Sequence, residues 1–417
     1  MSRLREKFSA QAVLQALAAP MLALLTAFVL SSAVIAATGE DPFHAFYVMI
    51  DFGSKSDSQV WIVNKAIPYY LSAAAVAIGF RMNLFNIGVD GQYRVAAFFA
   101  AVVGGALALP GVLQIGVIIL VAMAVGALWA GIAGVLKTTR GVSEVITTIM
   151  LNSIAGSLIG YFLSEDKLAV KDGNLFHTPT IPEAARFFLI PTTPDPIYGT
   201  VIIAVVIGLA YWFVLGRTRF GFDLRAVGRS ESAASASGVS VRRMVVTSMV
   251  LSGAVAGLVG MPTLLNKSFS YGTDFPTGVG FTGIAIALLG RNHPIGMALA
   301  ALLWGFLERT GLQLEFEGYA QEIVGVMQGI IVLCVVIAYE IVRRVVLRRQ
   351  QSAVGAELSA QGGQGGQGGQ STPREPGGPG EPGGPGGPGG PGEPGGPGGS
   401  GDKSAESTQA KKAGTTA

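Results

Sequence analysis

The chain has 417 residues, of which 50% are apolar and only 13% are charged, and its mean hydropathy is +0.51. A soluble protein normally carries about 25% charged residues, so this composition indicates a membrane protein. The net charge of +3 gives no reason to expect nucleic-acid binding. The single cysteine, Cys334, excludes an internal disulfide framework and a cysteine-based zinc site.

The N-terminal basic residues are followed by an apolar run that extends to about Ala37. Because this run is too long for the apolar core of a cleaved signal peptide, we expect a retained first span. A span requires about 20 mostly apolar residues. The sequence therefore predicts an all-α polytopic membrane protein of about ten transmembrane helices, at 20–38, 62–80, 95–110, 112–136, 145–163, 197–215, 244–264, 278–290, 294–312 and 322–342. The third and eighth predicted spans are short, so each could instead be a broken or a re-entrant helix.

Loop charges predict the orientation of these spans. With the N-terminus in the cytoplasm, most Lys and Arg residues fall in cytoplasmic loops, as the positive-inside rule requires. The opposite loops are rich in acids: Glu40, Asp41, Asp51, Asp57, Glu165 and Asp166. We therefore expect both termini to be cytoplasmic.

Two regions lie outside the apolar pattern. The external loop 164–196 contains prolines that exclude a regular helix, and we expect it to form an ordered cap. The residues after Gln350 are rich in Gly, Gln and Pro, and we expect a disordered cytoplasmic tail. The predicted organisation is a cytoplasmic N-terminus (1–19), a transmembrane domain (20–349) with a cytoplasmic loop at 216–243, and the tail (350–417).

Catalytic motifs are missing from the sequence. There is no G-x-x-x-x-G-K-[ST] phosphate loop for ATP and no G-x-S-x-G nucleophile elbow. His44 and His177 are predicted outside and His293 inside, so the three histidines cannot share one metal ion. We expect neither an enzyme active site nor a bound metal or cofactor.

The segment Gly221–Arg243 interrupts the apolar pattern with arginines and a cluster of Ala, Ser and Gly. A helix built from such small side chains allows the backbone of another protein to approach closely, and a short helix of this kind can dock in a partner's groove. An ordinary positively charged loop is the alternative.

This segment resembles the coupling loop of ABC-importer permeases, whose pattern is E-A-A, three residues, then G. The matching positions are Ser232, Ala233, Ala234 and Gly238, with Ser232 in place of the usual acid, and Arg225 and Gly228 lie just before them. Four further stretches resemble the branched-chain amino acid, simple-sugar and nucleoside permease family, in family order: FNIGVDGQ (85–92), GVSEVITTIMLNSIA (141–155), LSGAVAGLVG (251–260) and FTGIAIALLGRNHPIG (281–296). Ser143 departs from the expected Asn. The last two stretches and the long external loop are most similar to the nucleoside branch.

The resemblance implies partners that the chain itself lacks. A cytoplasmic ABC ATPase would dock on the coupling loop and hydrolyse ATP, and an extracytoplasmic solute-binding lipoprotein would deliver the solute. A second permease subunit, homologous or identical, would complete the path in a bacterial plasma membrane, among membrane lipids and without nucleic acid. This chain would supply the translocation path.

Polar residues within the apolar regions are candidates for that path, because polar groups in a membrane generally face a cavity or another helix. The candidates are the polar residues Asn83, Asn86, Asp90, Gln92, Glu144 and Asn152, together with the aromatic Phe85. For Asp90 and Glu144 the alternative is helix capping or pairing with Arg94 or Arg140, and for Asn152 it is an interhelical hydrogen bond. Phe85, Trp129 and Phe281 could stack on a base, with packing as the alternative.

Other functions remain open at this point. The same machinery could carry simple sugars or branched-chain amino acids. An ion-coupled secondary transporter would use Asp90, Glu144 or Glu308 as the ion carrier, and a membrane scaffold is a third possibility.

Overall fold

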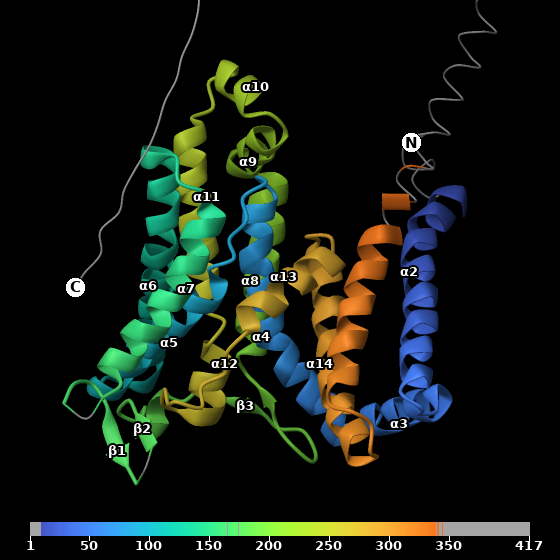
Figure 1. Cartoon of the computed structure of the whole chain (residues 1–417). Coiled ribbons are helices and arrows are strands. Elements are labelled where there is room, and N and C mark those ends of the chain that lie inside the picture. The colour runs from blue at the N-terminus through green and yellow to red at the C-terminus, as the bar shows by residue number, and fades with distance from the viewer. Residues whose placement is uncertain (1–9, 165, 174, 339, 342–343, 345–417) are drawn as a thin grey trace, which may run out of the picture. The chain divides into compact units, whose positions relative to one another are not determined.

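The computed structural model describes residues 10–164, 166–173, 175–338, 340–341 and 344, and these residues are mostly helical (Figure 1). The predicted tail (350–417) lies outside the described residues, as do residues 1–9 of the predicted cytoplasmic N-terminus (1–19), whose residues 10–19 already belong to the first helix.

Every predicted apolar segment contains a helix. The helices are α2 (Ala10–Ala37), α4 (Ser56–Phe80), α5 (Val89–Ala106), α6 (Gly111–Arg140), α7 (Glu144–Phe162), α8 (Val201–Arg217), α11 (Val241–Gly257), α13 (Val279–Leu289), α14 (Pro294–Phe316) and an unlabelled helix, Glu322–Ala338. By length and composition, five helical stretches of the described chain can cross a membrane: α4, α6, α7, α14 and Val241–Ser268, which joins α11, α12 (Met261–Thr263) and η2 (Leu264–Ser268). Helix α8 together with α9 (Arg219–Arg229) is a sixth if the bent pair is counted as one span. The fold class is thus helical with several spans, and the number ten stays a prediction.

The two short predicted spans, 95–110 and 278–290, correspond to helices of different length. Helix α13 has 11 residues, about 16 Å at 1.5 Å per residue, against a hydrocarbon core of about 30 Å. It therefore cannot cross alone, as expected for a broken or re-entrant helix. Helix α5 begins at Val89, six residues before the predicted start of its span, and so brings Asp90 and Gln92 into the helix.

Helix α4 is the centre of the packing. Its Ala-rich half from Ala66 to Gly79 is almost fully buried and contacts α11, α13 and α14. Glycine and alanine residues allow α6 and α11 to pack closely. A Cβ on Gly253 would overlap the Gly126 carbonyl oxygen, and one on Gly134 would lie 3.2 Å from Met249 Cβ.

The loop 164–196, which was predicted to be external, departs from the all-helical expectation. It contains two small antiparallel hairpins, β1 (Val170–Asp172) with β2 (Leu175–His177) and β3 (Leu189–Ile190) with β4 (Ile197–Tyr198), and a 3-10 turn, η1 (Glu183–Ala185). Main-chain hydrogen bonds join it to the segment after α12: Thr178 N to Tyr271 O (2.9 Å) and Ile181 N to Phe269 O (2.8 Å). The described part of the loop is therefore hydrogen-bonded to the rest of the chain, while its external position stays a prediction. Strands form because the extended, proline-rich chain needs partners for its backbone groups.

Helix α3 (Pro42–Gly53) was not predicted. Asp41 caps it by accepting a hydrogen bond from Phe43 N at 2.9 Å. One face buries Met49 against the rest of the chain, whereas Phe43 and Tyr47 are exposed. A helix that is apolar on its exposed face suits the membrane interface.

Candidate functional site

The predicted docking segment folds as two short helices, α9 (Arg219–Arg229) and α10 (Glu231–Ala236), at the top of Figure 1. Thr218 Oγ1 caps α9 by accepting a hydrogen bond from Gly221 N, and Ser230 Oγ caps α10 by accepting one from Ala233 N, each at 3.3 Å. Helix α9 bends by 69° from α8. Gly238 has φ +85°, a left-handed conformation that favours glycine and reverses the chain after α10.

The small residues of α10 do not all face outward. Ser232 and Ala233 are exposed, whereas Ala234 is only 4% exposed and packs into the main core. An added Cβ on Gly238 would meet nothing within 4 Å, so its backbone conformation, not space, requires glycine. The surface available to a partner is therefore that of Ser232, Ala233 and the exposed residues beside them.

Arg225 and Gly228 face the spans. Arg225 Nη1 donates a hydrogen bond to the Leu215 carbonyl oxygen at the end of α8. An added Cβ on Gly228 would lie 2.7 Å from the Arg81 carbonyl oxygen, so the backbones of α9 and of the turn after α4 touch. These two residues attach α9 to the helices beneath it.

Asn83 joins α9 to the non-helical segment 81–88. Its Nδ2 donates to the Gly228 carbonyl oxygen at 2.7 Å, and its φ of +55° is a left-handed conformation that Asn tolerates better than most residues. Segment 81–88 thus lies directly against α9, on the predicted cytoplasmic side.

Asn86 and Gln92 form a closed amide pair. Asn86 Nδ2 donates to Gln92 Oε1 (3.0 Å), and Gln92 Nε2 donates back to Asn86 Oδ1 (2.8 Å). Asn86 Nδ2 also donates to Ser252 Oγ (2.8 Å), whose hydroxyl donates to the Ala75 carbonyl oxygen (2.6 Å). Asn86 is 1% exposed and Gln92 0%. The pair connects segment 81–88 to α5, α11 and α4.

Asp90 connects α5 to α13. Its Oδ1 accepts hydrogen bonds from Gly278 N (2.8 Å) and Gly280 N (3.3 Å), at the N-terminus of α13. A carboxylate there is favoured by the free N–H groups and the helix dipole. Arg94 Nη1 lies 3.9 Å from Asp90 Oδ2, which is the pairing given as the alternative to a role in the solute path, and the carboxylate caps a second helix in addition.

Asn152 makes the interhelical hydrogen bonds that were the alternative to solute contact. Its Oδ1 accepts from Gly91 N (2.9 Å), and its Nδ2 donates to the Ile87 carbonyl oxygen (3.0 Å). The side chain thereby replaces helical hydrogen bonds that are missing at the start of α5.

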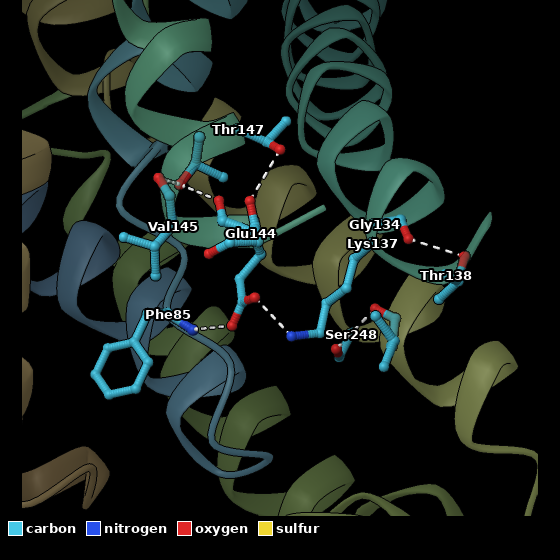
Figure 2. A network of polar contacts seen from close by, with 11 residues as sticks. Phe85, Gly134, Lys137, Thr138, Glu144, Val145, Thr147 and Ser248 are labelled. Carbon is cyan, nitrogen blue, oxygen red and sulfur yellow. Dashed lines mark hydrogen bonds and ion pairs between the residues drawn. The ribbon is translucent and has the colours of Figure 1, made fainter. Parts of the chain in front are cut away.

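Glu144 pairs with Lys137 and not with Arg140 (Figure 2). Its Oε2 lies 2.6 Å from Lys137 Nζ, and its side chain is 9% exposed. Oε1 accepts a long hydrogen bond from Phe85 N (3.5 Å). Arg140 ends α6 in an exposed position, while Lys137 lies one turn earlier on the face toward α7.

The three aromatic candidates differ in their exposure. Figure 2 shows the Phe85 ring pointing away from Glu144, and it packs edge-on against Phe80 with centroids 5.2 Å apart. Phe85 and Phe281 are about half exposed, whereas Trp129 packs against the core. Stacking on a base stays a prediction for the first two.

Together the predicted site residues form a junction. Asn86, Asp90, Gln92, Glu144 and Asn152 each bind a partner within the chain, and they join α4, α5, α7, α11 and α13 beneath α9. Sequence reasoning missed Lys137 and Ser252 as partners. The hydroxyl of Ser252, within an otherwise apolar Gly-Ala cluster, was the available signal. Within the described ranges, no group of three or more His, Cys, Asp or Glu residues could hold a metal ion.

Residues 60–336 match the family described as "Branched-chain amino acid transport system / permease component". The guanosine ABC transporter permease protein NupP of Bacillus subtilis is 39% identical over 285 residues, 67% of this chain and 81% of that protein. The nucleoside ABC transporter permease protein NupB of Lactococcus lactis is 29% identical (82% of this chain, 96% of that protein). The glucose ABC transporter permease protein TsgB13 of Haloferax volcanii is 30% identical (75% and 85%). No solved structure matches significantly. With the family matched over most of its transmembrane region, this chain belongs to the permease components of the branched-chain amino acid transport system family.

Proposed function

We propose that this chain is the permease subunit of an ATP-driven importer that carries nucleosides across a bacterial plasma membrane. Family membership supports the permease role, and the names of the guanosine and nucleoside relatives support the substrate class. An extracytoplasmic binding lipoprotein would deliver the solute, and a second permease subunit would complete the path. Simple sugars, which the glucose relative's name favours, or branched-chain amino acids are the second candidate substrates.

The arrangement of α9 and α10 supports this mechanism. Helix α10 exposes a surface of small side chains, and the adjoining helix α9 is attached to segment 81–88. The exposed side chains of Ser232 and Ala233 are small enough for a partner's backbone to approach. A cytoplasmic ABC ATPase docked there would push on α9 when it binds and hydrolyses ATP. The ATP would be bound and hydrolysed by the ATPase, and not by this chain.

The push would spread through the polar junction. Asn83 and the close contact at Gly228 join α9 to segment 81–88. Asn86 continues the path to α11 and α4, and Asp90 continues it to the N-terminus of the short helix α13. Because α13 is too short to span the membrane alone, a shift of its N-terminus would change access to the middle of the protein.

Ion coupling is the weaker alternative, because it needs an acid able to take up and release an ion. Asp90 caps α13, and Glu144 is ion-paired with Lys137. Glu308 Oε1 pairs with Lys65 at 2.9 Å, and its other oxygen accepts a hydrogen bond from Tyr69. Each proposed ion carrier already has partners within the chain.

The docking role is tested with Ala233→Trp in the complex assembled with its ATPase. The indole would occupy the surface that the partner's backbone must approach. We expect the ATPase to co-purify poorly and uptake to be lost, while the permease itself keeps its thermal stability. Thr139→Trp, at the exposed end of α6, is the matched control and should change neither. Normal uptake by Ala233→Trp would exclude docking on α10.

The substrate class is tested separately with the purified binding protein of the same system. We expect it to bind nucleosides more tightly than ribose, glucose or leucine by calorimetry. Tighter binding of a sugar or of leucine would move this chain to the other candidate substrates and leave the docking proposal intact.

A further inference from the structure

An apolar groove of about 710 Å³ lies between α4, α8 and α14, away from the polar junction. Val205, Leu209 and Trp212 of α8 and Ile295 of α14 line it, and each is about half exposed or more. Ile67 of α4 is buried at its base. These side chains leave a substantial apolar surface that no described residue covers.

The dimensions of the groove suit one acyl chain. Along α8 it extends from Val201 to Trp212, about 16 Å at 1.5 Å per residue. This is about half of the roughly 30 Å hydrocarbon core, or one leaflet. A transmembrane helix of a partner would need a contact surface of the full thickness.

One end of the groove is basic. His293 lines both the groove and an adjoining cavity of about 420 Å³, which Arg81 and Arg291 also line. At the same end, the Arg217 guanidinium carbon lies 5.1 Å from the ring centroid of Trp212, which is itself a lining residue. Cations and an indole at the end of an apolar groove are typical of the membrane–water interface.

The hydrogen-bond partners of Arg81 at this end are neutral groups. Arg81 Nη2 donates to the Asn292 carbonyl oxygen (2.7 Å), and its Nε donates to the Tyr211 hydroxyl (3.3 Å), which are both neutral acceptors. In the part of the chain that the structure describes, no carboxylate forms an ion pair with Arg81, Arg217 or His293.

We propose that the groove and its basic end bind one anionic phospholipid. An acyl chain occupies the groove, and the phosphate lies among Arg217, His293 and Arg81. Clusters of basic residues on the cytoplasmic side of a membrane protein recognise anionic lipid headgroups in this way. The site joins the ends of α4 and α8 to the turn before α14, and it does not depend on which solute the protein carries.

The test measures lipid binding to the purified full-length chain by native mass spectrometry, with phosphatidylglycerol and phosphatidylcholine of identical acyl chains. We expect phosphatidylglycerol to be retained in preference. The double variant Arg217→Gln/His293→Gln should bind it roughly fivefold more weakly, the factor for loss of about one interfacial cation. Arg140→Gln removes a cytoplasmic charge far along the chain from the groove and should have no effect. Val205→Trp fills the groove and should weaken binding of both lipids.

Four results would overturn the proposal. Equal retention of the two lipids, or equal damage from Arg140→Gln, would indicate only unselective contact with the bilayer. Displacement of the lipid by millimolar glycerol 3-phosphate would indicate a soluble-anion site. Disulfide-linked dimers of Val205→Cys, made on a Cys334→Ser background, would show that a second copy covers the groove.

Discussion

Replacing Gly228 with alanine should loosen α9 from the helices beneath it. The added Cβ would lie 2.7 Å from the Arg81 carbonyl oxygen and 2.9 Å from Met82 Cα. Both are main-chain atoms, so no side-chain rotation relieves the overlap, and α9 or segment 81–88 has to move. That movement stretches the 2.7 Å hydrogen bond from Asn83 Nδ2 to the Gly228 carbonyl oxygen.

The expected cost follows from these contacts. Overpacking of a close contact costs about 1–3 kcal/mol, and a weakened hydrogen bond adds about 0.5–1.5 kcal/mol. The higher helix propensity of alanine offsets up to about 1 kcal/mol. A net loss of about 2 kcal/mol shifts the equilibrium between attached and detached α9 by roughly 30-fold.

The assay compares ATP-driven solute uptake and ATP hydrolysis in the assembled complex. We expect Gly228→Ala to lose most uptake while the ATPase keeps its basal hydrolysis, because the push no longer reaches the spans. Gly216→Ala in α8 is the matched control, since its Cβ would meet nothing within 4 Å. Wild-type uptake by Gly228→Ala, or an equal loss in the control, would refute the reasoning.

Three further predictions concern the junction and the tail. Lys137→Met leaves the Glu144 carboxylate buried without its cation and should lower the free energy of unfolding by about 3 kcal/mol. Thermal unfolding measures this loss, and the Lys137→Met/Glu144→Gln double variant should recover most of it. Ser252→Ala leaves an Asn86 N–H unsatisfied and should cost about 1–3 kcal/mol in the same measurement, so an unchanged melting temperature would contradict the role of the amide pair. Deletion of 350–417 should leave uptake intact, and reduced uptake would give the tail a function.

The positions of the helices were predictable because long apolar runs have few other solutions in a membrane. Helix α3 and the two hairpins were not predictable in this way, because they form in loops whose structure depends on contacts distant in sequence. The early start of α5 has the same cause. Asp90 and Gln92 are tolerated inside a buried helix only because Gly278, Gly280 and Asn86 supply their hydrogen-bond partners.

The candidate site was predictable as a set of polar residues and not as a network. Glu144 has two cations nearby in sequence, and only the rotation of α6 against α7 selects Lys137 over Arg140. Likewise the coupling-loop pattern does not tell which alanine faces a partner. The structure exposes Ala233 and buries Ala234, which follows from the docking of α10 on the rest of the chain.

The central claim is that force from a cytoplasmic ATPase, applied through α9 and α10, drives solute through a permease that has no energy source of its own. Uptake of labelled nucleoside into proteoliposomes tests it most directly. The account predicts accumulation only when the ATPase, the second permease subunit, the binding protein and ATP are all present. Accumulation by this chain alone, driven by a proton or sodium gradient without nucleotide, would contradict it.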